Sequence, residues 1–183
     1  MVVLKRLDDA IKSGDNIRAI IRHTGVNQDG RTAGIAMPNR SAQQKLISSV
    51  YQQAGLDPQD TAYIEAHGTG TAAGDVEELA AIHSAFDGHG SGSTPLYVGS
   101  IKPNIGHLEN ASGIAGFIKS VLMLEKGMIP PIVNLQVLKD NLDIEGSRIK
   151  VSPCLFLTYT KPTLSRSLVN WNLGQKGLCD VYP

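Results

Sequence analysis

Apolar residues recur along this chain in two patterns, short runs and one-sided stripes. Short runs rich in β-branched residues are typical of buried strands, and stripes at helical spacing are typical of helices packed on a sheet. Strands are predicted at residues 1–4, 17–22, 62–66, 96–101 and 148–151, and helices at 41–54, 75–86 and 112–126. The alternation predicts an α/β fold.

Polar residues and glycines mark the ends of these elements. Ser41 with Gln44, and Asp75 with Glu78, have the spacing of a capping box at the start of a helix. Gly127 is placed to end the last helix. A short turn is expected at 7–12, a long loop at 25–34 and a surface loop at 87–94, whereas no clear element is predicted from residue 152 onward.

Composition and charge narrow the choice of partner. The 42% hydrophobic content suffices for one core, and the 17 basic residues balance the 17 acidic residues. A formal charge of zero argues against nucleic acid or an anionic membrane as the main partner. No apolar run approaches the ~20 residues that span a bilayer, so a cytoplasmic protein is expected. Cys154 and Cys179 have neither metal nor disulfide spacing, and no bound metal is expected.

Two predicted strands end in glycine-rich turns that each carry a histidine. The strand at 62–66 leads into His67, and the strand at 96–101 leads into Lys102 and His107. In an open α/β sheet, ligands bind in the crevice beyond the carboxyl ends of the strands. His67, His107 and Lys102 are therefore the candidate site.

The chemistry of these residues suits a thioester or a ketone. A histidine can move a proton near neutral pH, and it can donate a hydrogen bond to an oxyanion. His107 lies just before a predicted helix, whose dipole disfavours the imidazolium form, and the charge of Lys102 acts in the same direction. The hydroxyls of Thr69 and Thr71 are suited to bind an extended chain that carries amides.

The same residues admit three other interpretations. The glycines at 68, 70 and 74 are similar to a dinucleotide-binding fingerprint, but the spacing is one residue too long and no acid ends the next strand. A zinc site would need more ligands than two histidines. Both histidines can also be satisfied core residues, although their equivalent positions at two strand ends favour a joint role. His83 and His89 are given no role.

Residues 65–71 and 102–109 closely resemble the two histidine motifs of β-ketoacyl synthases. In the residues at 110–116 and 121–127, the chain most resembles the ketosynthase domain of iterative, highly reducing polyketide synthases of the fungal type. The resemblance runs from about residue 2 to about residue 151 and includes residues 26–32, 110–119 and 121–127.

The resemblance implies a thiolase-like layered fold, of which residues 1–151 are the C-terminal half and 152–183 a divergent tail. It implies a decarboxylative Claisen condensation between an enzyme-bound acyl thioester and malonyl on an acyl carrier protein. In this family, His67 would assist decarboxylation and hold the thioester oxygen, His107 would complete the oxyanion site, and Lys102 would order their hydrogen bonds. Thr69 and Thr71 would contact the phosphopantetheine arm of the carrier protein, with no cofactor bound directly.

The sequence departs from the family pattern at its nucleophile. The family's cysteine belongs to the half of the domain that precedes residue 1, and nothing like its motif occurs here. Neither Cys154 nor Cys179 has the helix N-terminus or paired base that would activate a thiol. Pro103 stands where the family usually has serine or threonine, and residues 168–174 begin like the family's last strand and then diverge.

The sequence therefore predicts a partial polyketide β-ketoacyl synthase that is inactive in condensation on its own. A non-catalytic partner or binding module of a polyketide synthase, and a non-functional truncated product, are the alternative hypotheses. The expected partners are an acyl carrier protein and a polyketide synthase or ketosynthase chain. Self-association is also expected, because half of a layered fold leaves an apolar face uncovered.

Overall fold

The computed structural model describes residues 1–32, 34, 37–86, 94–133, 135, 146–151, 157–158, 167–172 and 176–182, the last three ranges as backbone only. The helices are α1 (Leu7–Ser13), α2 (Arg40–Ala54), α3 (Ala72–Phe86), α4 (Lys102–Ile105) and α5 (Ser112–Lys126), with the 3-10 helices η1 (Pro58–Asp60) and η2 (Glu109–Ala111). The strands are β1 (Ile20–Asn27), β2 (Tyr63–Glu65), β3 (Leu96–Gly99), β4 (Met128–Ile129), β5 (Ile149–Val151), β6 (Leu157–Thr158), β7 (Ser167–Asn172) and β8 (Lys176–Tyr182).

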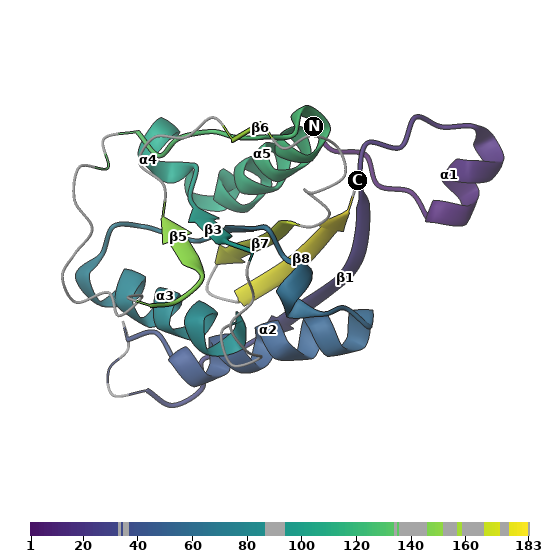
Figure 1. The fold of residues 1–183 in the computed structure, drawn as a ribbon. Helices are drawn as coiled ribbons and strands as arrows, with labels where there is room; N and C mark the ends of the chain where they lie inside the picture. Colours follow the sequence, from purple (N-terminus) through teal and green to yellow (C-terminus); the bar gives the residue numbers. More distant parts are fainter. Residues whose placement is uncertain are drawn as a thin grey trace.

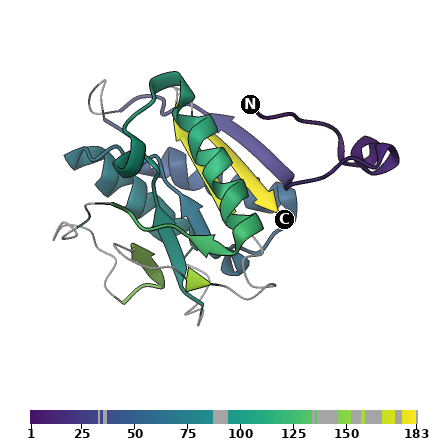
Figure 2. The same cartoon turned by 90° about the horizontal axis from the view of Figure 1, so that it is seen from above.

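A central sheet organises the molecule. Its strand order is β1-β8-β7-β2-β3-β5, with β7, β2, β3 and β5 parallel and β8 antiparallel to both of its neighbours. Helices α2 and α3 cover one face, and α5 lies on the opposite face (Figures 1 and 2). Because β2 and β3 are adjacent and parallel, their carboxyl ends meet at one edge, as the sequence predicts.

The main core lies between the sheet and the helices α2 and α3. Ile64 of β2 faces this side, whereas the neighbouring Tyr63 packs with residues beside α5. Such a strand is buried on both faces, which explains why two large apolar residues, Tyr63 and Ile64, follow each other in it. The cluster under α2 and α3 consists of Leu46, Ile47, Val50, Tyr51, Ile64, Ala66, Ile82, Ala85, Phe86, Leu96, Val98 and Ile149.

Several segments differ from the sequence predictions, and one of them is β1, which begins at Ile20 and runs to Asn27, into the loop expected at 25–34. Residues 1–4 form no strand: Val3 is 85% exposed, and the segment leads into α1, which projects from the body of the molecule (Figure 1). Residues 7–12 form α1 rather than a turn, with Asp8 and Asp9 at its positive end and Lys12 at its negative end. The tail, where no element is predicted, contributes β7 and β8 to the sheet. The division of the chain at residue 151 stays a prediction.

The two predicted capping boxes are also wrong. Asn39 caps α2 by accepting a hydrogen bond from the Ala42 N–H at 3.2 Å. Thr71 immediately precedes α3 and accepts from the Gly74 N–H at 3.1 Å. Both helices therefore begin earlier than the capping-box pattern predicts. In contrast, α5 has the predicted bounds and ends at Gly127, which adopts a left-handed conformation.

Candidate functional site

His67 lies in the turn that follows β2. The Glu78 carboxylate on α3 accepts hydrogen bonds from the backbone N–H groups of His67 at 2.7 Å and Gly68 at 2.9 Å. Gly68 has a φ of 46°, and a Cβ built there would lie 2.8 Å from the Cβ of Ser100. The turn after β2 is thus packed against the turn after β3, and glycine is needed at the contact.

Glu78 is a buried carboxylate that supports the turn carrying His67, whereas the sequence pattern predicts only a helix-capping role for it. It is 5% exposed. Burial raises its pKa, and the hydrogen bonds from Gly68 and His67, followed by the charge of Lys102, oppose the shift. An acidic residue on the same helical stripe as Ile82 was the signal in the sequence, because such a position is normally apolar.

Lys102 opens α4 at the end of the neighbouring strand. Its backbone N–H donates to the Ser100 Oγ at 3.3 Å, and Pro103 occupies the first turn, where a helix tolerates proline. Burial lowers the pKa of Lys102, and the negative charges of Glu78 and Glu65 partly offset this effect. The ammonium group is therefore held in the electrostatic field of two carboxylates.

His107 follows α4 and stands next to His67. The two ring centroids are 5.7 Å apart, with the planes nearly perpendicular at 88°. The Nδ1 atom of His107 accepts from the Glu109 backbone N–H at 3.0 Å and lies 3.1 Å from the Ser112 Oγ. Since a backbone N–H can only donate, the neutral ring carries its proton on Nε2. His107 can therefore offer an N–H group to a ligand oxygen.

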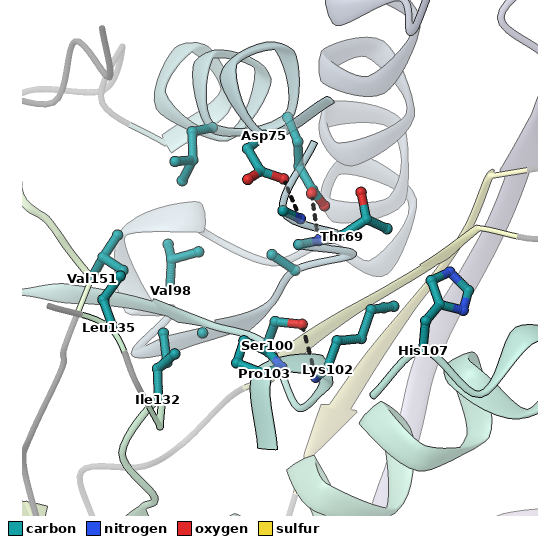
Figure 3. Close-up of a pocket in the computed structure, with 16 residues that line it drawn as sticks. Thr69, Asp75, Val98, Ser100, Lys102, Pro103, His107, Ile132, Leu135 and Val151 are labelled. Carbon is teal, nitrogen blue, oxygen red and sulfur yellow. Dashed lines mark hydrogen bonds between the residues drawn. The ribbon is translucent and has the colours of Figure 1, made fainter. Parts of the chain in front are cut away.

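A cavity of about 490 Å³ opens beside these residues. Figure 3 shows Thr69, Lys102 and His107 on one side, with the Lys102 side chain extending toward His107, and apolar residues on the other. His67 and Thr71 do not line it, and the exposed Thr71 lies with its Oγ1 3.4 Å from that of Thr69. The apolar side consists of Val98, Ile132, Leu135 and Val151.

A buried polar network lies behind the site. Glu65, 2% exposed, accepts from the Lys119 Nζ at 2.7 Å, the Tyr63 hydroxyl at 2.5 Å and the Ile101 backbone N–H at 2.6 Å. Burial, together with the charge of Glu65, raises the pKa of Tyr63 well above its usual value. The network joins β2, α5 and the turn after β3, next to the segments that carry His67, His107 and Lys102. Glu65 and Lys119 lie within the segments that resemble the family, but no local pattern in the sequence predicts that they form an ion pair.

Within the described part of the chain, no group of three or more histidine, cysteine, aspartate or glutamate side chains is arranged to hold a metal ion. The described helices include none that is both long and apolar enough to cross a membrane. Cys154 lies outside the described residues, and Cys179 lies on β8, where only the backbone is described.

Residues 18–136 match the family described as beta-ketoacyl synthase, C-terminal domain. The chain is 52% identical over 169 residues to the highly reducing polyketide synthase sdnO of Sordaria araneosa, covering 92% of this chain and 5% of that synthase. It is 56% identical over 135 residues to the highly reducing polyketide synthase tstA of Talaromyces stipitatus, covering 74% of this chain and 5% of that synthase.

Solved ketosynthases have the same fold. The ketosynthase from module 6 of the bacillaene synthase of Bacillus subtilis 168 matches with a TM-score of 0.90 and 32% identity, over 97% of this chain and 34% of that one. The ketosynthase from module 1 of the bacillaene synthase of Bacillus amyloliquefaciens FZB42 gives a TM-score of 0.90 and 36% identity, over 98% and 35%. These matches confirm the predicted thiolase-like α/β class.

The chain belongs to the β-ketoacyl synthase family and corresponds to its C-terminal domain. Its relatives include highly reducing polyketide synthases from fungi. It spans about a third of the length of the solved ketosynthases and a small fraction of the synthases.

Proposed function

We propose that this chain supplies the histidine half of a β-ketoacyl synthase site for decarboxylative condensation of an acyl thioester with malonyl on an acyl carrier protein. The observation that carries the proposal is the pairing of His67 and His107 at 5.7 Å, with the Nδ1 of His107 occupied by a backbone donor. The nucleophilic cysteine comes from a separate part of the synthase, on the same or another polypeptide.

In the proposed reaction the bond between the malonyl carboxylate and its methylene carbon breaks, and carbon dioxide leaves. The electron pair remains on the thioester as an enolate, whose carbon attacks the cysteine-bound acyl carbonyl and releases the cysteine thiolate. Imidazole N–H groups of His67 and His107 stabilise the developing charge on oxygen. Lys102 adds positive charge beside them, and its lowered pKa places its deprotonation closer to neutral pH.

The substrate carrier in this proposal is the phosphopantetheine arm of an acyl carrier protein. An arm of this kind carries amide groups, for which the hydroxyls of Thr69 and Thr71 are suitable hydrogen-bonding partners. Thr69 lies on the wall of the cavity, and Thr71 is exposed two residues further along the chain. Thr69 is therefore the residue of the two that we expect to affect binding more strongly.

The test supplies the cysteine-bearing half of a fungal highly reducing ketosynthase as a second polypeptide and measures decarboxylation of malonyl thioester. His67→Ala and His107→Ala should each lower the rate by about 10²–10³, the usual cost of losing an oxyanion donor. His83→Ala is the matched control, because His83 is a partly buried residue of α3.

Unchanged decarboxylation in His67→Ala would remove this residue from the site. Equal losses in all three variants would indicate that the substitutions act through folding. If the two polypeptides form a complex with no decarboxylation, the chain is a binding module. The isolated chain should acquire no acyl group from an acyl thioester by intact mass, and an adduct on Cys154 or Cys179 would contradict the assignment of the nucleophile to another segment.

A further inference from the structure

We propose that Ser112 is a positioning residue for His107. Its hydroxyl and the Glu109 backbone N–H hold the imidazole ring through Nδ1, so that Nε2 carries the proton and can donate it in a hydrogen bond to a ligand. This inference rests on the proposed function of His107 as an oxyanion donor. It adds a residue that lies outside both histidine motifs and to which the sequence analysis gave no role.

The contact between Ser112 and His107 is buried on the serine side. Ser112 is the first residue of α5 and only 6% exposed, and its Oγ lies 3.1 Å from the Nδ1 of His107. A hydroxyl can donate or accept, so this distance alone leaves the direction of the hydrogen bond open. The Glu109 N–H lies 3.0 Å from the same nitrogen and fixes the direction of the hydrogen bond, because this group can only donate. Nδ1 must be the acceptor, and Ser112 is therefore a second donor to it.

The backbone at Glu109 makes the second donor important. Among the described residues, Glu109 is the one non-glycine residue with a positive φ, at 49°. Such a conformation persists only when its surroundings hold it in place. Ser112 begins a helix of fifteen residues and so contributes a donor from a rigid element. The ring is thereby fixed between a strained turn and a helix.

The arrangement assigns one task to each ring nitrogen of His107. Nδ1 faces two donors, and a proton on it would point at the Glu109 N–H. Nε2 keeps the proton and remains for a ligand, on a residue that lines the cavity. Without the Ser112 hydroxyl, the ring has one anchor and can rotate or exchange tautomers, which lowers the fraction of molecules with a donor in place.

The experiment is a long-range proton–nitrogen NMR correlation of the histidine rings in the ¹⁵N-labelled chain. In the wild type we expect a protonated Nε2 and a hydrogen-bonded, unprotonated Nδ1. Ser112→Ala should shift the Nδ1 signal toward that of a nitrogen with one donor fewer and reveal a second tautomer. Ser112→Thr keeps the hydroxyl and should restore the wild-type signals.

Ser120→Ala is the matched control. Ser120 lies on the same helix, is fully buried, and donates to the Gly116 carbonyl at 3.0 Å. Its loss should leave the His107 signals in place. If Ser112→Ala does not fold, Ser112→Cys provides the same comparison, because its thiol is a weaker donor and should cause a smaller shift of Nδ1.

Two results would overturn the proposal: a proton on Nδ1 in the wild type, or His107 signals that Ser112→Ala leaves unchanged. The measurement needs neither substrate nor the cysteine-bearing half. A failure of the decarboxylation assay therefore counts against the proposed function alone, whereas unaltered ring signals count against the role of Ser112 alone.

Discussion

At the scale of single residues, the turn after β2 requires glycine for two different reasons, a left-handed backbone conformation at Gly68 and Gly70 and a close contact at Gly68. Both have positive φ, at 46° and 81°, but only Gly68 faces a neighbour, the side chain of Ser100. Gly70→Ala should cost about 1–2 kcal/mol through the left-handed backbone alone. Gly68→Ala should cost about 1–3 kcal/mol more, because its methyl group overlaps Ser100. Urea unfolding of both variants measures the difference, and equal values would show that the turn can move away from Ser100.

A second prediction at this scale concerns the stability that depends on Glu78. A glutamine has one acceptor oxygen for the two N–H groups of His67 and Gly68, so Glu78→Gln should cost about 1–3 kcal/mol at neutral pH. The effect depends on pH, because burial raises the pKa of Glu78 above its ordinary 4.5.

The folded protein therefore keeps this proton to higher pH than the unfolded chain does. The stability that comes from this bound proton is full below pH 4.5 and is lost as pH rises through the folded pKa, whereas the hydrogen bonds from His67 and Gly68 remain. Glu78→Gln has no such proton, so the difference in unfolding free energy between wild type and variant should shrink over that range. Denaturant unfolding at several pH values tests this, and a constant difference would contradict the raised pKa.

At the scale of elements, the ion pair of Glu65 and Lys119 fastens α5 to the sheet. Their side chains are 2% and 10% exposed, so removing the cation leaves a buried carboxylate unpaired. Lys119→Met should destabilise the fold by about 3–5 kcal/mol. Lys126→Met, on the exposed last turn of the same helix, should cost less than about 1 kcal/mol.

A double-mutant cycle shows whether the Lys119 effect comes from the pair. Adding Glu65→Gln to Lys119→Met removes the unpaired charge, so the double variant should lose less stability than the sum of the two single changes. Additive losses would mean that Lys119 acts mainly by packing, for example over the ring of Tyr63, whose centroid lies 5.3 Å from the ammonium group.

At the scale of the whole molecule, α5 lies on one face of the sheet (Figure 2), and exposed apolar side chains occur on this helix and just before it. Ile114 and Leu122 on this helix are 46% and 41% exposed, and Ile105 and Leu108 just before it are 49% and 43% exposed. Apolar surface of this kind favours association. We expect the mass of the isolated chain in light scattering to rise with concentration.

The combined change Ile114→Gln and Leu122→Gln should reduce this association. Val26→Gln is the control, because Val26 is 64% exposed but lies on β1. A single monomeric mass at all concentrations would contradict the prediction. Equal effects of the two sets of changes would indicate that the chain associates through nonspecific hydrophobic contacts and not through the surface of α5.

Much of the fold and part of the site follow from local patterns in the sequence. The stripe of α5 and its terminal Gly127 predict its bounds, and the glycine-rich turns predict that His67 and His107 meet at one edge of the sheet. Glu78 and Ser112 were missed because a polar residue on a helix is ordinarily solvated. Only the hydrogen bonds that the buried side chains of Glu78 and Ser112 make in the folded structure reveal that these side chains have a different role.

The sequence by itself determined the elements whose signals lie within a few residues: the helical stripes, the buried strands and the histidine turns. Tertiary structure decided which distant segments pair. It placed β7 between β2 and β8, left residues 1–4 outside the sheet, and joined Glu65 to Lys119 across 54 positions. The physical reason is that periodicity and capping arise from neighbours along the chain. The strength of a buried hydrogen bond or ion pair depends instead on which groups exclude water around it.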